Sequence, residues 1–150
     1  MKASAQSLCN NILSRAHEEK IEITPMKLQK ILYYVCVKYV KETGIFPIYE
    51  RFEVWKYGPV IPSVYSEFKT FGASPIKGFA CNAKKKSMMV DEDANPILKS
   101  CIDYVWNKLK TYDGVDLAKR THQKGGGWRS AYQNGNEIIS TEEMKCDETL

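Results

Sequence analysis

The chain has 150 residues, a length typical of a single domain with one hydrophobic core. Hydrophobic residues make up 43% of it and charged residues 27%, an ordinary globular composition that argues against intrinsic disorder. The net charge of +4 is lower than dedicated nucleic-acid binders usually carry. No apolar run approaches the roughly 18 residues that cross a bilayer. We therefore expect one domain, residues 1–150, that stays in the cytoplasm without a membrane partner.

Two amphipathic helices are predicted at the start of the chain. Between Ala3 and Glu19 the apolar residues recur at the i, i+3, i+4 and i+7 spacing of a helix with one buried stripe. Thr24 and Pro25 predict the start of a second helix, because threonine caps helices and proline lacks the N–H that stays unpaired at the first position. Gly44 is placed to end this helix in a left-handed conformation.

The next segment predicts a minor β element. Three prolines and a glycine interrupt any helix over residues 47–62, while Phe52-Glu53-Val54-Trp55 has the aromatic and β-branched character of a short strand. Pro62 then predicts a third helix, which Gly72 closes. Residues 73–93 show no helical or strand period, so we expect a loop or a loose hairpin there.

The second half of the chain predicts further helices. Asn95-Pro96 repeats the cap-plus-proline signal and starts a long helix that ends near Asp113-Gly114. Shorter helical segments are expected over residues 115–122 and 128–132, and the capping-box spacing Ser140-Thr141-Glu142-Glu143 predicts one more. The predicted fold class is therefore mainly α, a compact helical bundle with a minor β element inserted after the second helix.

Signatures of catalysis are largely missing from the chain. Gly125-Gly126-Gly127 is not followed by the Lys-Ser/Thr of a phosphate-binding loop, and two histidines, His17 and His122, are too few for a histidine-rich metal site. A general base formed by His122 with Asp113 or Asp116 stays an alternative to a structural histidine. We predict no enzymatic activity, no catalytic residue, no cofactor and no metal.

Two groups of residues allow a binding function. Lys84-Lys85-Lys86 could contact nucleic-acid phosphates, although the acidic residues at 91–93 favour a solvated loop. Trp55, Tyr57 and Tyr65 are either core aromatics or a binding platform, because partly exposed Trp and Tyr side chains anchor protein interfaces. A protein partner is thus favoured over a nucleic-acid partner.

Three blocks of the sequence occur in an order that identifies a family. They are Pro25 to Tyr34 (PMKLQKILYY), Phe52 to Tyr65 (FEVWKYGPVIPSVY), and Leu117 to His122 followed by Trp128. Together they resemble the Panacea domain, also called the SocA-like antitoxin domain. The chain departs from the family pattern at residues 123–127, where three glycines replace a short proline-containing step.

The resemblance implies the antitoxin of a toxin–antitoxin pair, which neutralises a cognate toxin by direct binding and not by catalysis. It transfers no catalytic residue to this chain. One alternative, implied by the same resemblance, is a phage- or mobile-element-encoded inhibitor of a host defence protein. Another is a nucleic-acid-binding autoregulator, suggested by the net charge of +4 and the lysine run.

A mostly preformed surface on the second helix and the segment from Trp55 to Tyr65 is predicted to bind the partner protein. Partly exposed tyrosines would anchor the partner, and lysines would steer an acidic one toward the surface. The predicted partner-binding residues are Lys27, Lys30, Tyr33, Trp55, Lys56, Tyr57 and Tyr65.

Four motif residues are predicted to support this surface structurally. Gly58 is expected to take a backbone conformation that a side chain would hinder, and Pro59 to fix the adjacent turn. His122 and Trp128 complete the set. Because distant motif residues usually share a site, we expect Trp55, Tyr57, His122 and Trp128 to gather in one region.

Overall fold

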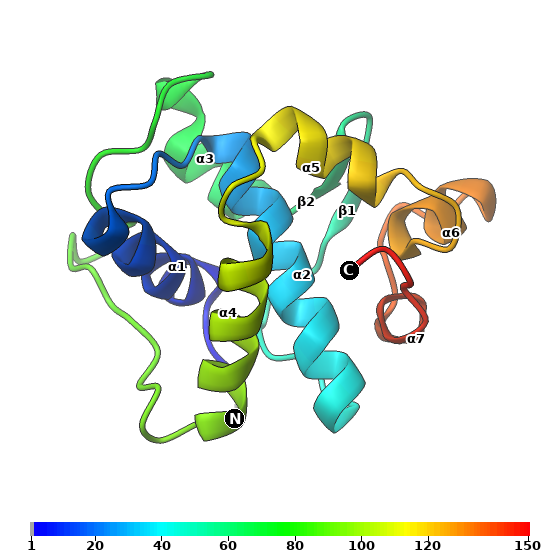
Figure 1. The fold of residues 1–150 in the computed structure, drawn as a ribbon, viewed down its shortest axis with the longest axis horizontal. Helices are drawn as coiled ribbons and strands as arrows, with labels where there is room; N and C mark the ends of the chain where they lie inside the picture. Colours follow the sequence, from blue (N-terminus) through cyan, green and yellow to red (C-terminus); the bar gives the residue numbers. More distant parts are fainter. Residues whose placement is uncertain (1) are drawn as a thin grey trace.

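The computed structural model describes residues 2–150, which form a helical bundle with one small antiparallel hairpin (Figure 1). Its helices are α1 (Ala5–Glu19), α2 (Pro25–Thr43), α3 (Pro62–Phe68), α4 (Pro96–Leu109), α5 (Gly114–Thr121), α6 (Gly127–Gln133) and α7 (Thr141–Lys145), with a 3-10 turn, η1 (Lys69–Phe71), after α3. The strands are β1 (Glu53–Trp55) and β2 (Gly58–Val60). Helices cover 52% of the chain, so the predicted mainly α fold with a minor β element after the second helix is confirmed.

Side-chain caps explain where the helices begin. The Thr24 side chain accepts a hydrogen bond from the backbone N–H of Lys27, and Asn95 caps α4 in the same way. Ser140 forms the predicted capping box with Glu143. The prediction that α4 reaches Asp113 is wrong, because Asp113 instead caps the N-terminus of α5.

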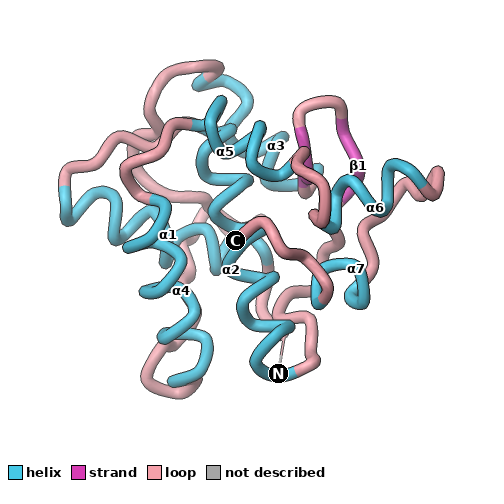
Figure 2. The backbone as a smooth tube through the Cα atoms, turned by 45° about the vertical axis from the view of Figure 1, so that its right-hand side comes forward, coloured by secondary structure: helices cyan, strands magenta, loops and turns pink. Residues whose placement is uncertain are grey.

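The central helix α2 is surrounded by the rest of the molecule. It packs against α1, α4, α5, α7 and β2, and Figures 1 and 2 show it between α1 and α4 on one side and α6 and α7 on the other. Every residue from Lys27 to Val37 is buried, so the helix has no solvent-facing stripe over this stretch. Neither α2 nor another helix of residues 2–150 has the length and hydropathy needed to cross a bilayer.

The segment from residue 73 to 93 is a loop tied to α1; it contains no strand, and it reverses direction at residues 82–86, where the Asn82 N–H donates to the Lys86 carbonyl at 2.8 Å. Two buried asparagines of α1 hold it by side-chain to backbone hydrogen bonds. The Asn10 amide donates to the Ala80 carbonyl at 3.0 Å and accepts from the Ala80 N–H at 2.8 Å. Asn11 pairs with both backbone groups of Val90 in the same way. Each asparagine therefore replaces a strand partner for the loop.

The residues after α7 form a strap across α2, and Figures 1 and 2 both place the C-terminus beside this helix. The Asp147 carboxylate accepts a hydrogen bond from the Tyr33 hydroxyl at 2.6 Å, and the hydroxyl groups of Thr149 and Tyr34 lie 2.7 Å apart. The Arg120 Nε on α5 donates to the Thr149 carbonyl at 2.6 Å. The strap therefore covers the tyrosines of the first motif block.

Candidate functional site

A groove of about 470 Å³ lies between the N-terminal half of α2, the β1–β2 turn and α3. Most of its lining is apolar and comes from Met26, Trp55, Tyr57, Val60, Val64 and Tyr65. Its polar lining comes from Gln29, Lys30, Lys56 and Lys69. A concave, mostly apolar surface with a few polar groups has the general character of a binding site.

Polar side chains of α2 hold one wall of the groove in place. The Gln29 amide donates to the Ile61 carbonyl and accepts from the Ile61 N–H, both at 3.0 Å. The Lys30 Nζ donates to the Pro59 carbonyl at 3.1 Å. These bonds fix β2 and the start of α3 against the central helix, so the groove exists before any partner binds.

Gly58 allows the β1–β2 turn to approach α2 and α5 closely. Its φ of +116° lies in a region that residues with a side chain rarely adopt. A Cβ atom there would lie 2.8 Å from Thr121 Oγ1 and 2.9 Å from Lys30 Cε. The turn therefore requires glycine both for its backbone conformation and for space.

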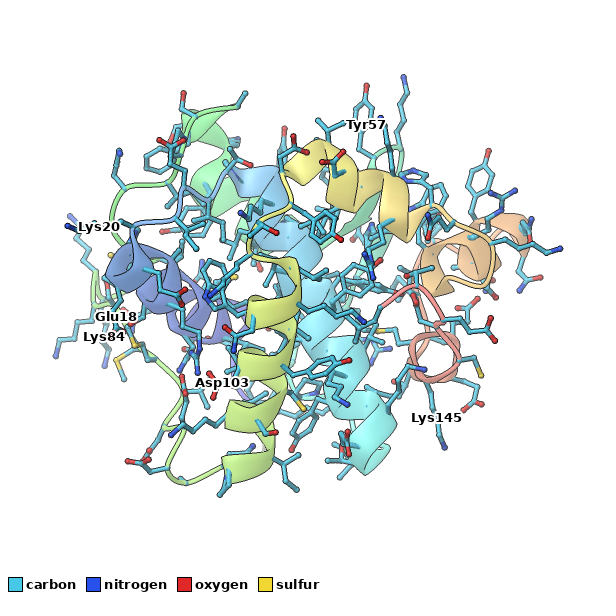
Figure 3. All side chains as sticks on the ribbon, viewed as in Figure 1. Glu18, Lys20, Tyr57, Lys84, Asp103 and Lys145 are labelled. Carbon is cyan, nitrogen blue, oxygen red and sulfur yellow. The ribbon has the colours of Figure 1, made fainter. Side chains whose placement is uncertain are left out.

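His122 and Trp128 support the β1–β2 turn from behind. The Trp128 Nε1 donates to the Trp55 carbonyl at 2.9 Å, and the His122 Nε2 lies 2.9 Å from the Lys56 carbonyl oxygen. The two rings pack with their centroids 4.0 Å apart. The structure thus brings Trp55, His122 and Trp128 together, while the Tyr57 side chain is 59% exposed. Figure 3 shows Tyr57 at the outer edge of the molecule.

The arrangement around His122 gives no support to a general base. Its two ring nitrogens contact the carbonyl oxygens of Ala118 and Lys56. Asp113, one of the two possible carboxylate partners, accepts a hydrogen bond from the backbone of α5 instead. Within residues 2–150 no three His, Cys, Asp or Glu side chains group as a metal site would require.

The expectation that Tyr33, Lys27 and Lys30 are exposed on α2 is wrong. Tyr33 is fully buried and donates to Asp147. Lys27 is buried as well, and its ammonium donates to the Lys110 carbonyl at the end of α4. The C-terminal strap and the α4–α5 connection cover these side chains, so neither Tyr33 nor Lys27 is available as an anchor or a steering charge.

Lys30 is a buried amine in the floor of the groove. Its residue surface is 1% exposed, and desolvation by this burial lowers the pKa of Lys30 to about 7. Lys30 is therefore not the exposed steering lysine that was expected, but a buried amine that titrates near neutral pH. The sequence offers no signal for this, because Lys30 is covered by β2, which follows it by almost thirty residues.

Replacing Lys30 with methionine is expected to reduce the pH dependence of stability. Because the pKa of Lys30 is about 7 in the folded chain and ordinarily about 10.4 when unfolded, the unfolded state binds more protons between these values. The free energy of unfolding should therefore rise by about 2–3 kcal/mol more in the wild type than in Lys30→Met between pH 7 and pH 9.5. Urea denaturation at both pH values measures this difference.

The control for this prediction is Lys99→Met on α4, which removes an exposed charge and should leave the pH dependence as in the wild type. Equal pH dependence in the wild type and Lys30→Met would show that Lys30 keeps its charge in the folded chain up to pH 9.5.

The other predicted partner-binding residues lie at the groove and are accessible. Tyr57 is 59% and Tyr65 46% exposed, and Lys56 is exposed with its Nζ 5.4 Å from the Tyr57 ring centroid. Trp55 is half-buried, with its ring edge-on to Tyr65 at 5.1 Å between centroids. Four residues of the prediction therefore share one surface.

Several lining residues were not predicted from the sequence. Met26 and Gln29 lie on α2, while Val60, Val64 and Lys69 come from β2, α3 and η1. On α3, Val64 is buried although it lines the groove. Its neighbour Tyr65 is 46% exposed and lines the same groove.

Comparison with known proteins gives two matches. The family model described as "Antitoxin SocA-like, Panacea domain" matches residues 28–129. The chain is 28% identical over 130 residues to Antitoxin SocA of Caulobacter vibrioides (strain NA1000 / CB15N), covering 83% of this chain and 68% of that protein. No solved structure matches the chain significantly. The matched region holds most of the groove and the residues that support its turn.

Proposed function

Because the chain belongs to the SocA-like Panacea domain family, we propose that it is an antitoxin that neutralises a cognate toxin by direct binding in the cytoplasm. The observation that carries this proposal is the preformed groove with two exposed tyrosines at its edge. Tyrosine side chains bury a large area while losing few rotatable bonds, which makes them effective anchors. No catalytic step is part of the proposal.

The rigidity of the groove favours binding. Gln29 and Lys30 already hold the β2 backbone, and Pro59 and Pro62 restrict the chain beside it. Binding therefore includes little free-energy cost for ordering this surface. Lys56 and Lys69 at the rim would raise the association rate of an acidic partner more than its residence time.

The same surface would serve the alternative function of a phage- or mobile-element-encoded inhibitor of a host defence protein, since both functions require capture of a protein. The nucleic-acid alternative has less support. Lys84 and Lys86 lie in an exposed loop, where their backbone N–H groups donate to the Asn82 side chain. Residues 82–86, which hold this lysine run, form one exposed turn that contains no aromatic residue.

Alanine at Tyr57 or Tyr65 is expected to weaken partner binding by at least about 2 kcal/mol, which is roughly thirtyfold in Kd. The reason is that each variant removes an exposed aromatic anchor without opening the core. The measurements are rescue of growth during co-expression with the cognate toxin, and calorimetric binding to that toxin.

Tyr104→Ala is the matched control, because Tyr104 is also 46% exposed but lies on α4. It should leave rescue and affinity unchanged. If both groove variants fold, rescue and bind as the wild type does, the interface lies elsewhere, and the loop over residues 73–93 is the next surface to test.

A further inference from the structure

We infer that the groove receives an acidic segment of the partner protein, in which a Glu or Asp carboxylate pairs with Lys30 while a neighbouring apolar side chain packs against Trp55 and Tyr65. This inference rests on the proposed function, because the segment belongs to the bound partner. It adds the chemical class of the occupant, which the family match leaves open.

The charges of the groove favour such an occupant. Three lysines, Lys30, Lys56 and Lys69, are among its lining residues, and no Asp or Glu is. The rest of the lining is mostly apolar and aromatic. A segment that combined a carboxylate with a large apolar side chain would match both features, whereas a basic or wholly polar segment would match neither.

Lys30 has unused hydrogen-bonding capacity at the floor of the groove. An ammonium group carries three N–H donors, and the described residues provide the Lys30 Nζ with one acceptor, the Pro59 carbonyl at 3.1 Å. A charged amine that is 1% exposed and so poorly paired costs free energy. A carboxylate from the partner would supply both the missing acceptor and the missing countercharge.

The groups around Lys30 do not supply that countercharge. From β2 it meets the Pro59 carbonyl, and from α5 it lies near the Thr121 hydroxyl, which donates to Ala118. His122, also behind the turn, contacts the Lys56 carbonyl. The other titratable residues of the groove are Lys56, Tyr57, Tyr65 and Lys69, and none of them is acidic.

Binding of a carboxylate should therefore be coupled to proton uptake. The pKa of Lys30 is lowered to about 7 by desolvation alone, and a carboxylate beside it would raise that pKa again. Below pH 7 the amine is already charged and binds the carboxylate fully. As the pH rises above 7 the free protein loses the proton, so the affinity for an acidic segment should fall.

The test uses two capped peptides that differ in one isosteric group, acetyl-Phe-Glu-Phe-amide and acetyl-Phe-Gln-Phe-amide, with the full chain labelled at its lysines for NMR. We expect the Glu peptide to bind at least about tenfold more tightly than the Gln peptide at pH 6, and this preference to shrink at pH 8.5. At saturation with the Glu peptide, the titration midpoint of Lys30 should move upward by at least about one pH unit.

Lys30→Met should abolish the preference, so that the two peptides bind with equal affinity, and the control Lys99→Met, which removes the same charge outside the groove, should keep the preference. The NMR titration uses the wild-type chain, so it still tests the inference if Lys30→Met does not fold. Equal affinities at pH 6, an unchanged Lys30 midpoint at saturation, or no binding of either peptide at millimolar concentration would each overturn it.

The outcomes separate this inference from the proposed function. If the peptides bind equally but Tyr57→Ala abolishes neutralisation, the occupant is not acidic and the antitoxin function stands. If the Glu peptide is preferred but neutralisation survives both tyrosine variants, Lys30 does bind carboxylates and the groove is not where the toxin is held.

Discussion

Replacing Asp147 with alanine is expected to lower the free energy of unfolding by about 3–5 kcal/mol. Asp147 is 1% exposed, and its carboxylate accepts hydrogen bonds from the Tyr33 hydroxyl at 2.6 Å and the Gly127 N–H at 2.8 Å. It also accepts from the backbone and the hydroxyl of Thr149, both at 2.7 Å. Alanine would leave several of these donors buried without an acceptor. Urea denaturation measures the loss.

The neighbouring Glu148 provides the control. Its carboxylate is exposed, so Glu148→Ala should change the free energy of unfolding by less than about 0.5 kcal/mol. The strap is held to α2 through Asp147. Asp147→Ala should therefore also change the near-ultraviolet circular dichroism of Tyr33 and Tyr34. A stable Asp147→Ala variant with an unchanged spectrum would show that the strap contributes little to the fold.

Replacing Gly58 with alanine is expected to cost at least about 3 kcal/mol of the free energy of unfolding. The backbone has a φ of +116°, and the new Cβ would lie 2.8 Å from Thr121 Oγ1. Thr121 has little freedom to move, because its hydroxyl donates to the Ala118 carbonyl at 2.7 Å. The β1–β2 turn should therefore shift away from α2. Partner binding should weaken as a result, because Trp55 at the end of β1 and Tyr57 in the turn line the groove.

Gly135→Ala is the matched control for this prediction. Gly135 also has a positive φ, +71°, but a Cβ atom there would meet nothing within 4 Å. Gly135→Ala should therefore lower the free energy of unfolding only by the cost of the left-handed conformation, about 1–2 kcal/mol. Urea denaturation of both variants compares the two costs, and equal losses would mean that space beside Gly58 is not limiting.

The helices and most of their ends could be predicted from neighbours in the sequence. Thr24, Asn95 and Ser140 each accept a hydrogen bond from a backbone N–H three residues later, so the whole signal lies within one turn of chain. Gly44 ends α2 with a φ of +74°, as its position after the last helical residues predicts. The three motif blocks carry the family resemblance as well, and the family model over residues 28–129 confirms it.

Part of the groove could also be predicted. Trp55, Lys56, Tyr57 and Tyr65 are close in sequence, and two prolines and a glycine among them restrict the turn that presents them. The residues that complete the groove, Met26 and Val60 among them, required the hairpin to fold back on α2. That placement depends on the Gln29 and Lys30 hydrogen bonds to backbone groups about thirty residues later.

The burial of individual side chains on α2 was decided only by the tertiary structure. Its sequence suggested one apolar stripe with lysines beside it, yet Lys27 is covered by the carbonyl of Lys110 and Tyr33 by Asp147. Caps and helical periods act between residues within a few positions, so the sequence by itself determined the helices and most of their limits, although α4 ends at Leu109, before the predicted Asp113. The tertiary structure decides which faces of α2 are buried. The burial of Lys27 and Tyr33 depends on contacts with residues 83 and 114 positions away in the sequence. Such contacts leave no local pattern, because any polar group brought there by the fold can satisfy the buried donor.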